Sequence, residues 1–201
     1  MIDERFIILA VLIDFIGSGG YILDTLKGST KPNRVTWFLW TLIPAVALAG
    51  MIQEGASKTA LILAFVFGFI PLLVFIASFI NKKSFWKITK FDWICAALSI
   101  IGIAAWLVTN DGNLAIIFSI ITDTLATLPT LVKGFKAPET ESWLVYLNAA
   151  TASAITLLTL KNWDFASAAF TIYLLVACLI LFITIRFQIG KRLVALKINR
   201  V

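Results

Sequence analysis

The sequence predicts an all-α integral membrane protein with seven transmembrane helices, and three observations support this fold class. The 201 residues are 60% hydrophobic and their mean hydropathy is +0.96, well above the range of a water-soluble domain of this length. The 17 basic and 11 acidic side chains gather between long apolar segments. Each apolar segment is roughly 20 residues long, which is the length that a helix needs to cross the hydrocarbon core.

Seven apolar segments follow one another along the chain, at 6–26, 35–51, 59–80, 91–109, 113–132, 142–160 and 166–187. Short polar connections separate them and contain the residue types that end helices and form turns. Helices are favoured over a barrel because lipid satisfies no backbone groups and the segments do not alternate in hydrophobicity. We expect segment 6–26 to be a helix of the mature protein, since its leader is acidic as well as basic.

The basic residues predict the orientation of the helices. Of the 17 lysines and arginines, 14 follow the first, third, fifth or seventh segment and three lie on the opposite side. This bias predicts an outside N-terminus and a cytoplasmic C-terminus, in what we expect to be a prokaryotic inner membrane. The basic residues of the tail, Arg186, Lys191, Arg192, Lys197 and Arg200, would then lie against anionic lipid headgroups. Nucleic-acid binding is not expected, and homo-oligomer formation is left open.

Several functional classes are not expected. The chain has no histidine, and its two cysteines, Cys95 and Cys178, lie in apolar segments without CxxC spacing, so we expect packed thiols and no metal or cofactor. An enzyme is not expected either. The contexts of Asp14 and Asp123 lack the Gly-x-Gly-Asp pattern of membrane aspartyl proteases, and the last segment has no interior lysine for a retinal Schiff base.

An internal repeat divides the chain into related halves. A shift of 106 residues superimposes two polar loops and helix starts, placing Lys27-Gly28 on Lys133-Gly134, Pro32 on Pro138, Trp37 on Trp143 and Trp40 on Tyr146. We predict a first three-helix bundle at 1–81, a linker helix at 82–112, a second bundle at 113–188 and a basic tail at 189–201. Both bundles would enter the membrane from the same side. Such parallel repeats are typical of transporters with a site between the halves.

This arrangement resembles the SWEET and PQ-loop (MtN3-like) transporter superfamily, whose members have three helices, a linker helix, three more helices and an outside N-terminus. The resemblance covers nearly the whole chain, but the Pro-Gln motif of each repeat stands here as Asp24-Thr25 and Pro129-Thr130. The chain therefore resembles a distant branch. The resemblance implies a hinge at Pro129, with Asp24 at the equivalent position, and Pro44 marks a further point where a helix can bend. An ion pair with Lys27 is the alternative role for Asp24.

Two aspartates lie deep within apolar segments. Asp14 and Asp123 start polar stripes at helical spacing, which run through Ser18, Tyr21 and Thr25 in the first half and through Thr127 and Thr130 in the second. One interpretation is hydrogen bonding between neighbouring helices. The other is a relay for protons or cations, or direct contact with a solute.

Aromatic residues and an amide complete the predicted site. Trp37 and Trp143 begin their segments, where anchoring at the membrane interface is the expected role. Trp40 and Tyr146 lie one turn deeper and could stack on a ring-shaped solute, as paired aromatics do in the resembled family. Asn148 is a candidate hydrogen-bond donor to that solute.

The predicted function is a carrier, passive or proton-coupled, that moves a small polar solute by alternating access between the two bundles. A sugar-like or vitamin-like substrate is expected. The predicted substrate-binding residues are Trp40, Tyr146, Asn148, Asp14, Asp123 and Tyr21. The alternative is a membrane receptor or sorting protein on the same scaffold, similar to the KDEL receptor and without transport activity.

Overall fold

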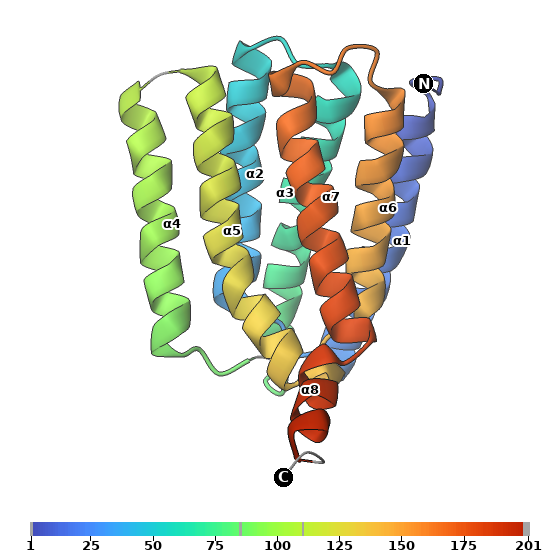
Figure 1. Cartoon of the computed structure of the whole chain (residues 1–201), viewed down its shortest axis with the longest axis vertical. Helices are drawn as coiled ribbons and strands as arrows, with labels where there is room; N and C mark the ends of the chain where they lie inside the picture. The colour runs from blue at the N-terminus through green and yellow to red at the C-terminus, as the bar shows by residue number, and fades with distance from the viewer. Residues whose placement is uncertain (1, 85, 110, 199–201) are drawn as a thin grey trace.

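The computed structural model describes residues 2–84, 86–109 and 111–198, and within these ranges the chain folds into helices without a strand (Figure 1). The helices are α1 (Phe6–Lys27), α2 (Arg34–Gln53), α3 (Lys58–Ile80), α4 (Lys90–Thr109), α5 (Gly112–Lys136), α6 (Trp143–Thr159), α7 (Phe165–Arg186) and α8 (Ile189–Ile198), with a 3₁₀ turn η1 (Pro138–Thr140) before α6. The seven predicted segments match α1–α7 to within a few residues. The helix α8 was not predicted, and Arg200 of the predicted tail lies outside the described residues.

Five helices, α1, α2, α3, α5 and α7, are long and apolar enough to cross a membrane. The apolar helix α6 is shorter, at 17 residues. All seven helices α1–α7 run side by side in one bundle, with α4 at its edge next to α5 (Figure 1). The prediction of an all-helical protein with long apolar helices is therefore confirmed.

Polar residues in the connections end and start the helices. Gly28 ends α1 in the left-handed conformation, at φ 85°, and its N–H donates to the carbonyls of Asp24 and Thr25. Asn33 starts α2 by accepting hydrogen bonds from the backbone of the first turn. Asp111 does the same for α5 and Asp164 for α7, each through its carboxylate. Such N-caps satisfy backbone donors that have no partner within the helix.

Contacts among α1–α3 correspond to contacts among α5–α7. In the first half α3 contacts both α1 and α2, and in the second half α7 contacts both α5 and α6. Across the halves, α1 packs on α6 and α2 packs on α5. If α1, α2 and α3 are matched with α5, α6 and α7 in this order, the contact of α1 with α3 corresponds to that of α5 with α7, and the contact of α2 with α3 to that of α6 with α7. The contact of α1 with α6 then corresponds to that of α5 with α2. The helix α4 lies outside this scheme and packs on α5 and α2.

Small residues bring the two halves together. A Cβ atom added to Gly17 of α1 would lie 2.8 Å from Cβ of Asn148 on α6. A Cβ atom added to Gly50 of α2 would lie 2.6 Å from the carbonyl oxygen of Gly112 on α5. Close packing of helices thus explains Gly17 and Gly50, as expected for interfaces within membranes.

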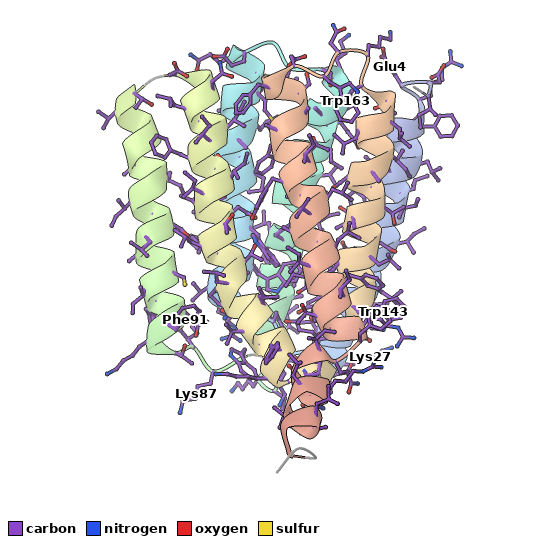
Figure 2. The ribbon with its side chains drawn as sticks, in the orientation of Figure 1. Glu4, Lys27, Lys87, Phe91, Trp143 and Trp163 are labelled. Atoms are coloured by element: carbon purple, nitrogen blue, oxygen red, sulfur yellow. The ribbon has the colours of Figure 1, made fainter. Side chains whose placement is uncertain are left out.

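The start of α1 and the helix α8 lie at opposite ends of the bundle (Figure 1). We call one end the basic end; it contains the loops 28–33, 81–89 and 137–142 together with α8. Lys27, Lys87 and Trp143 lie toward it, whereas Glu4 and Trp163 lie toward the opposite, N-terminal end (Figure 2).

Candidate functional site

A cavity lies in the middle of the bundle, between the two halves. It is lined by Asp14 and Ser18 of α1, Trp37, Trp40 and Pro44 of α2, Phe67, Ile70 and Pro71 of α3, Asp123 and Thr127 of α5, Val145, Tyr146 and Ala149 of α6, and Leu174, Ala177, Cys178 and Leu181 of α7. The helices α1, α2, α3, α5, α6 and α7 therefore all contribute to its wall. Its volume is about 60 Å³. That is room for roughly two water molecules, at about 30 Å³ each.

The polar part of the wall has the same composition in both halves. The first half contributes Asp14 and, one helical turn later, Ser18. The second half contributes Asp123 and, one turn later, Thr127. Both aspartates are 3% exposed. The fold thus brings the two polar stripes of the sequence to one cavity, although 109 positions separate the aspartates along the chain.

The hydrogen bonds of the two aspartates are incomplete. Oδ2 of Asp123 accepts from the Tyr173 hydroxyl of α7 at 2.8 Å, but Oδ1 has no partner. The Ser18 hydroxyl, also buried, has none either. Among the described residues no hydrogen bond to the Asp14 carboxyl group is found. Buried polar atoms are nearly always satisfied in native proteins, so these atoms are candidates to contact a ligand or water.

The charge of the cavity wall is one-sided. Its two ionisable carboxyl groups come from Asp14 and Asp123, and the lining contains no lysine or arginine. The described part of the chain holds no group of three histidine, cysteine, aspartate or glutamate residues that could bind a metal ion. The cavity therefore favours positively charged or neutral solutes over anions.

The predicted aromatic pair lies in the cavity wall. The Trp40 and Tyr146 ring centroids are 6.4 Å apart and the rings meet edge to face at 72°. Nε1 of Trp40 donates to the Thr127 hydroxyl at 3.2 Å and so joins α2 to α5. Trp37 is 2% exposed and packs on Trp40 and Tyr21, with centroids 5.1 and 4.9 Å apart. Its expected role as an interfacial anchor is therefore wrong, because neighbouring rings cover it.

Asn148, predicted as a hydrogen-bond donor to the solute, is not part of the cavity wall. Its Nδ2 donates to the backbone carbonyl of Ile13 on α1 at 3.1 Å. The side chain also packs where Gly17 lets α1 and α6 approach. Asn148 thus joins two helices of opposite halves, and the structure gives it a packing role in place of the predicted contact.

The three predicted hinge or gate residues lie in different surroundings. Pro44 lines the cavity, whereas Pro129 is buried within α5 away from the lining. Asp24 is half-buried near the end of α1, where its backbone carbonyl accepts from Ser29 and Thr30. The alternative ion pair between Asp24 and Lys27 is not found among the described residues. None of the three forms a contact that closes the cavity.

A buried ion pair lies between the cavity and the basic end. Nζ of Lys133 is 2.6 Å from Oε1 of Glu141, and both side chains are fully buried. The other carboxylate oxygen, Oε2, accepts from the Tyr21 hydroxyl at 2.9 Å and from the Tyr146 hydroxyl at 3.1 Å. We call Tyr21, Lys133, Glu141 and Tyr146 the Glu141 cluster. Each polar atom of these four side chains has a partner within the cluster.

The Glu141 cluster joins the two halves and adjoins the cavity. Tyr21 belongs to α1, whereas Lys133, Glu141 and Tyr146 belong to the second half. Nζ of Lys133 also donates to the backbone carbonyl of Lys31 in the loop between α1 and α2. Tyr146 lies in the cavity wall as well as in the cluster, so the two are in direct contact through this residue.

Sequence reasoning missed this cluster. Lys133 was counted among the basic loop residues that predict the orientation, but it is 1% exposed. Glu141 was not singled out, because the shift of 106 residues places it on apolar Val35 and the surrounding loop is polar. Tyr21 was predicted as a solute ligand, yet its hydroxyl is engaged by Glu141 and it does not line the cavity.

Comparison with known proteins gives no match to this chain. No protein-family model matches the chain, and no curated protein or solved structure is significantly similar to it. The function is therefore argued from the cavity and the Glu141 cluster.

Proposed function

We propose that the protein is a membrane carrier that moves a small polar solute by alternating access between two three-helix bundles, α1–α3 and α5–α7. The observation that carries the proposal is the central cavity, to which all six helices contribute and in which Asp14 and Ser18 face the equivalent Asp123 and Thr127. Transporters built from parallel repeats bind their substrate between the repeats near the membrane midplane. The helix α4 is then the linker between the bundles.

In this proposal α1–α7 all cross a prokaryotic inner membrane, with the N-terminus outside and the basic end in the cytoplasm. The basic residues of that end support the orientation. Support for a SWEET-like parallel repeat comes from the contacts of α1 with α6 and of α2 with α5, which exchange under the repeat. The basic face of α8, with Lys191 and Arg192 beside exposed apolar residues, suits an anionic lipid surface.

The Glu141 cluster is the proposed gate at the basic end. Opening this end requires the first bundle, with Tyr21, to move away from Glu141 of the second bundle. Lys133 would keep the carboxylate paired during this motion, because Lys133 and Glu141 belong to the same bundle. If transport is proton-coupled, Asp14 and Asp123 are the groups that exchange protons, since both line the cavity.

Native Cys178 gives a test of alternating access that does not require a known substrate. Its thiol lines the cavity, whereas Cys95 is buried on α4. We would reconstitute the Cys95→Ala variant in liposomes of defined orientation and apply a membrane-impermeant methanethiosulfonate reagent to one side at a time. A carrier exposes Cys178 to each side in turn, so modification is expected from both sides. The Cys178→Ala variant is the matched background.

Two results would contradict the proposal. Modification of Cys178 from one side at most, under all conditions, would indicate a cavity that does not alternate. Absence of flux in proteoliposomes for a panel of labelled sugars, amines and vitamins would favour the receptor alternative, because a receptor binds without moving its ligand across the bilayer.

A further inference from the structure

We infer that the central cavity binds a small organic cation, with an ammonium or similar positive group attached to an apolar body. This inference narrows the substrate class of the proposed carrier and rests on that proposal for the transport step. Binding itself follows from the charge and shape of the cavity, and it is tested separately below.

The acidic groups of the cavity have no positive partner within the protein. Four acidic side chains are buried in the described part of the chain. Glu141 is paired with Lys133, and the carboxylate of Asp92 accepts from Asn33 and from Thr89. The remaining two are Asp14 and Asp123, which face the cavity.

These two aspartates share the cavity wall without a lysine or arginine. Oδ1 of Asp123 and the hydroxyl of Ser18 are buried there without any partner. A buried carboxylate is unfavourable unless it is paired with a positive charge. A cation in the cavity would supply this charge, which no side chain of the wall provides.

The aromatic part of the wall suits the same kind of ligand. Trp37, Trp40, Tyr146 and Phe67 all line the cavity. The polar tips of two of them are already engaged, Nε1 of Trp40 by Thr127 and the hydroxyl of Tyr146 by Glu141. Nε1 of Trp37 is buried without a partner and can donate to a ligand, whereas Trp40, Tyr146 and Phe67 offer π surface. Ring faces attract ammonium groups, and aromatic cages are a recurring site for them.

Two other ligand classes fit less well. A sugar needs several hydrogen-bond partners, but most of the wall is apolar and Asn148 is bound to Ile13 outside the cavity. An inorganic divalent cation needs about six oxygen ligands, which the wall does not supply. The volume of about 60 Å³ also restricts the part of the ligand that enters the cavity to a compact positive group.

The experiment uses Cys178 as a reporter of occupancy in the purified Cys95→Ala protein. The rate of Cys178 modification by neutral methyl methanethiosulfonate is measured with tetramethylammonium, choline or benzylamine present. The matched neutral compounds are 3,3-dimethyl-1-butanol for choline and benzyl alcohol for benzylamine, and glucose represents the sugars. We expect at least one cation to protect Cys178, and its neutral counterpart and glucose to leave the rate unchanged.

Variants then identify the residues responsible. Asp14→Asn and Asp123→Asn should each weaken protection by the cation about 30-fold or more, because one partner of a buried charge pair is lost. Asp111→Asn is the control on α5; it lies outside the cavity, and asparagine caps a helix as well as aspartate does. The comparison of probe pairs uses the unmodified cavity, so the test stands even if one aspartate variant fails to fold.

The possible results separate the two proposals. If no cation protects, or if glucose and the neutral compounds protect equally well, the inference is overturned while the carrier proposal stands. If a cation protects but no labelled cation crosses the proteoliposome membrane, the cation site stands and the carrier proposal fails.

Discussion

Buried acidic side chains in two regions of the protein differ in how many bonding partners they have. In the Glu141 cluster the carboxylate is bound by Lys133, Tyr21 and Tyr146, so both of its oxygens have partners. In the cavity, Asp123 has one partner for two oxygens and Asp14 has none among the described residues. Both regions are buried, and Tyr146 connects them.

This difference distinguishes a contact that holds the two halves together from a site that can bind a ligand. A fully paired buried ion holds its neighbours in one arrangement, and loss of one partner is strongly destabilising. A buried carboxylate without a positive partner lowers the stability of the folded protein until it binds a positively charged ligand or a proton. The comparison predicts that mutations in the two regions have effects of different size and sign.

The largest expected effect is that of Glu141→Gln. This change leaves the Lys133 ammonium buried without its counter-charge, and we expect a loss of about 3–5 kcal/mol of stability. Thermal unfolding of the purified protein in detergent measures it. The double variant Lys133→Met/Glu141→Gln removes both charges and keeps an oxygen that can accept from the tyrosines, so it should recover more than half of the loss. Equal loss in single and double variants would contradict a role for the ion pair.

Tyr21→Phe should have the next largest effect. It removes the hydrogen bond that joins the first bundle to Glu141, at a cost of about 1.5–3 kcal/mol, typical of a hydrogen bond to a charged group. Cys178 should then react faster from the basic end. Tyr146→Phe is the matched control, because it removes a similar bond within the second bundle. The gate assignment fails if both variants raise the reactivity of Cys178 equally.

Asp123→Asn should change stability little and in the opposite direction. The amide oxygen can still accept from Tyr173, while the uncompensated charge is gone, so stability should rise by about 1 kcal/mol or stay the same. Flux in proteoliposomes should nevertheless fall at least tenfold. Unfolding and flux are measured on one preparation, with Asp111→Asn as control. Loss of stability as large as that of Glu141→Gln would show that Asp123 is a structural residue.

The smallest expected effect concerns an exposed ion pair outside the bundle. Lys191 of α8 donates to Glu139 of η1 at 2.7 Å, and this hydrogen bond lowers the pKa of Glu139 below its ordinary value of 4.5. The side chain of Lys191 is 48% exposed and that of Glu139 is 58% exposed. Solvent screening therefore limits the contribution of the ion pair to stability to less than about 1 kcal/mol.

The pH dependence of this contribution has a definite sign. Because the folded-state pKa is lowered, the contribution is present above pH 4.5 and is lost as the pH falls through the folded value. Glu139→Gln should therefore lower the unfolding temperature slightly at pH 7, and this difference should shrink as the pH falls below 4.5. A difference that does not shrink as the pH is lowered would exclude the ion pair as its cause.

Much of the fold could be predicted from local sequence. Apolar segments of helical length predicted α1–α7, and capping residues such as Asn33 and Asp111 mark where helices begin. The helix α8 was missed because its short basic sequence has the composition of a solvated tail. Trp37 was misplaced because a tryptophan at a helix start is usually interfacial, and no local pattern indicates that Tyr21 and Trp40 cover its ring.

The sequence by itself determined that this is an apolar, basic, all-helical chain, and that Asp14 and Asp123 lie deep in their helices. Periodicity, length and charge are local properties, so they can be read along the chain. The tertiary structure alone decided that the aspartates share one cavity, that Asn148 lies outside it, and that Glu141 meets Lys133 and Tyr21. The physical reason is that burial and pairing depend on neighbours from other helices: Tyr21 and Glu141 are 120 positions apart along the chain, and packing alone brings them together.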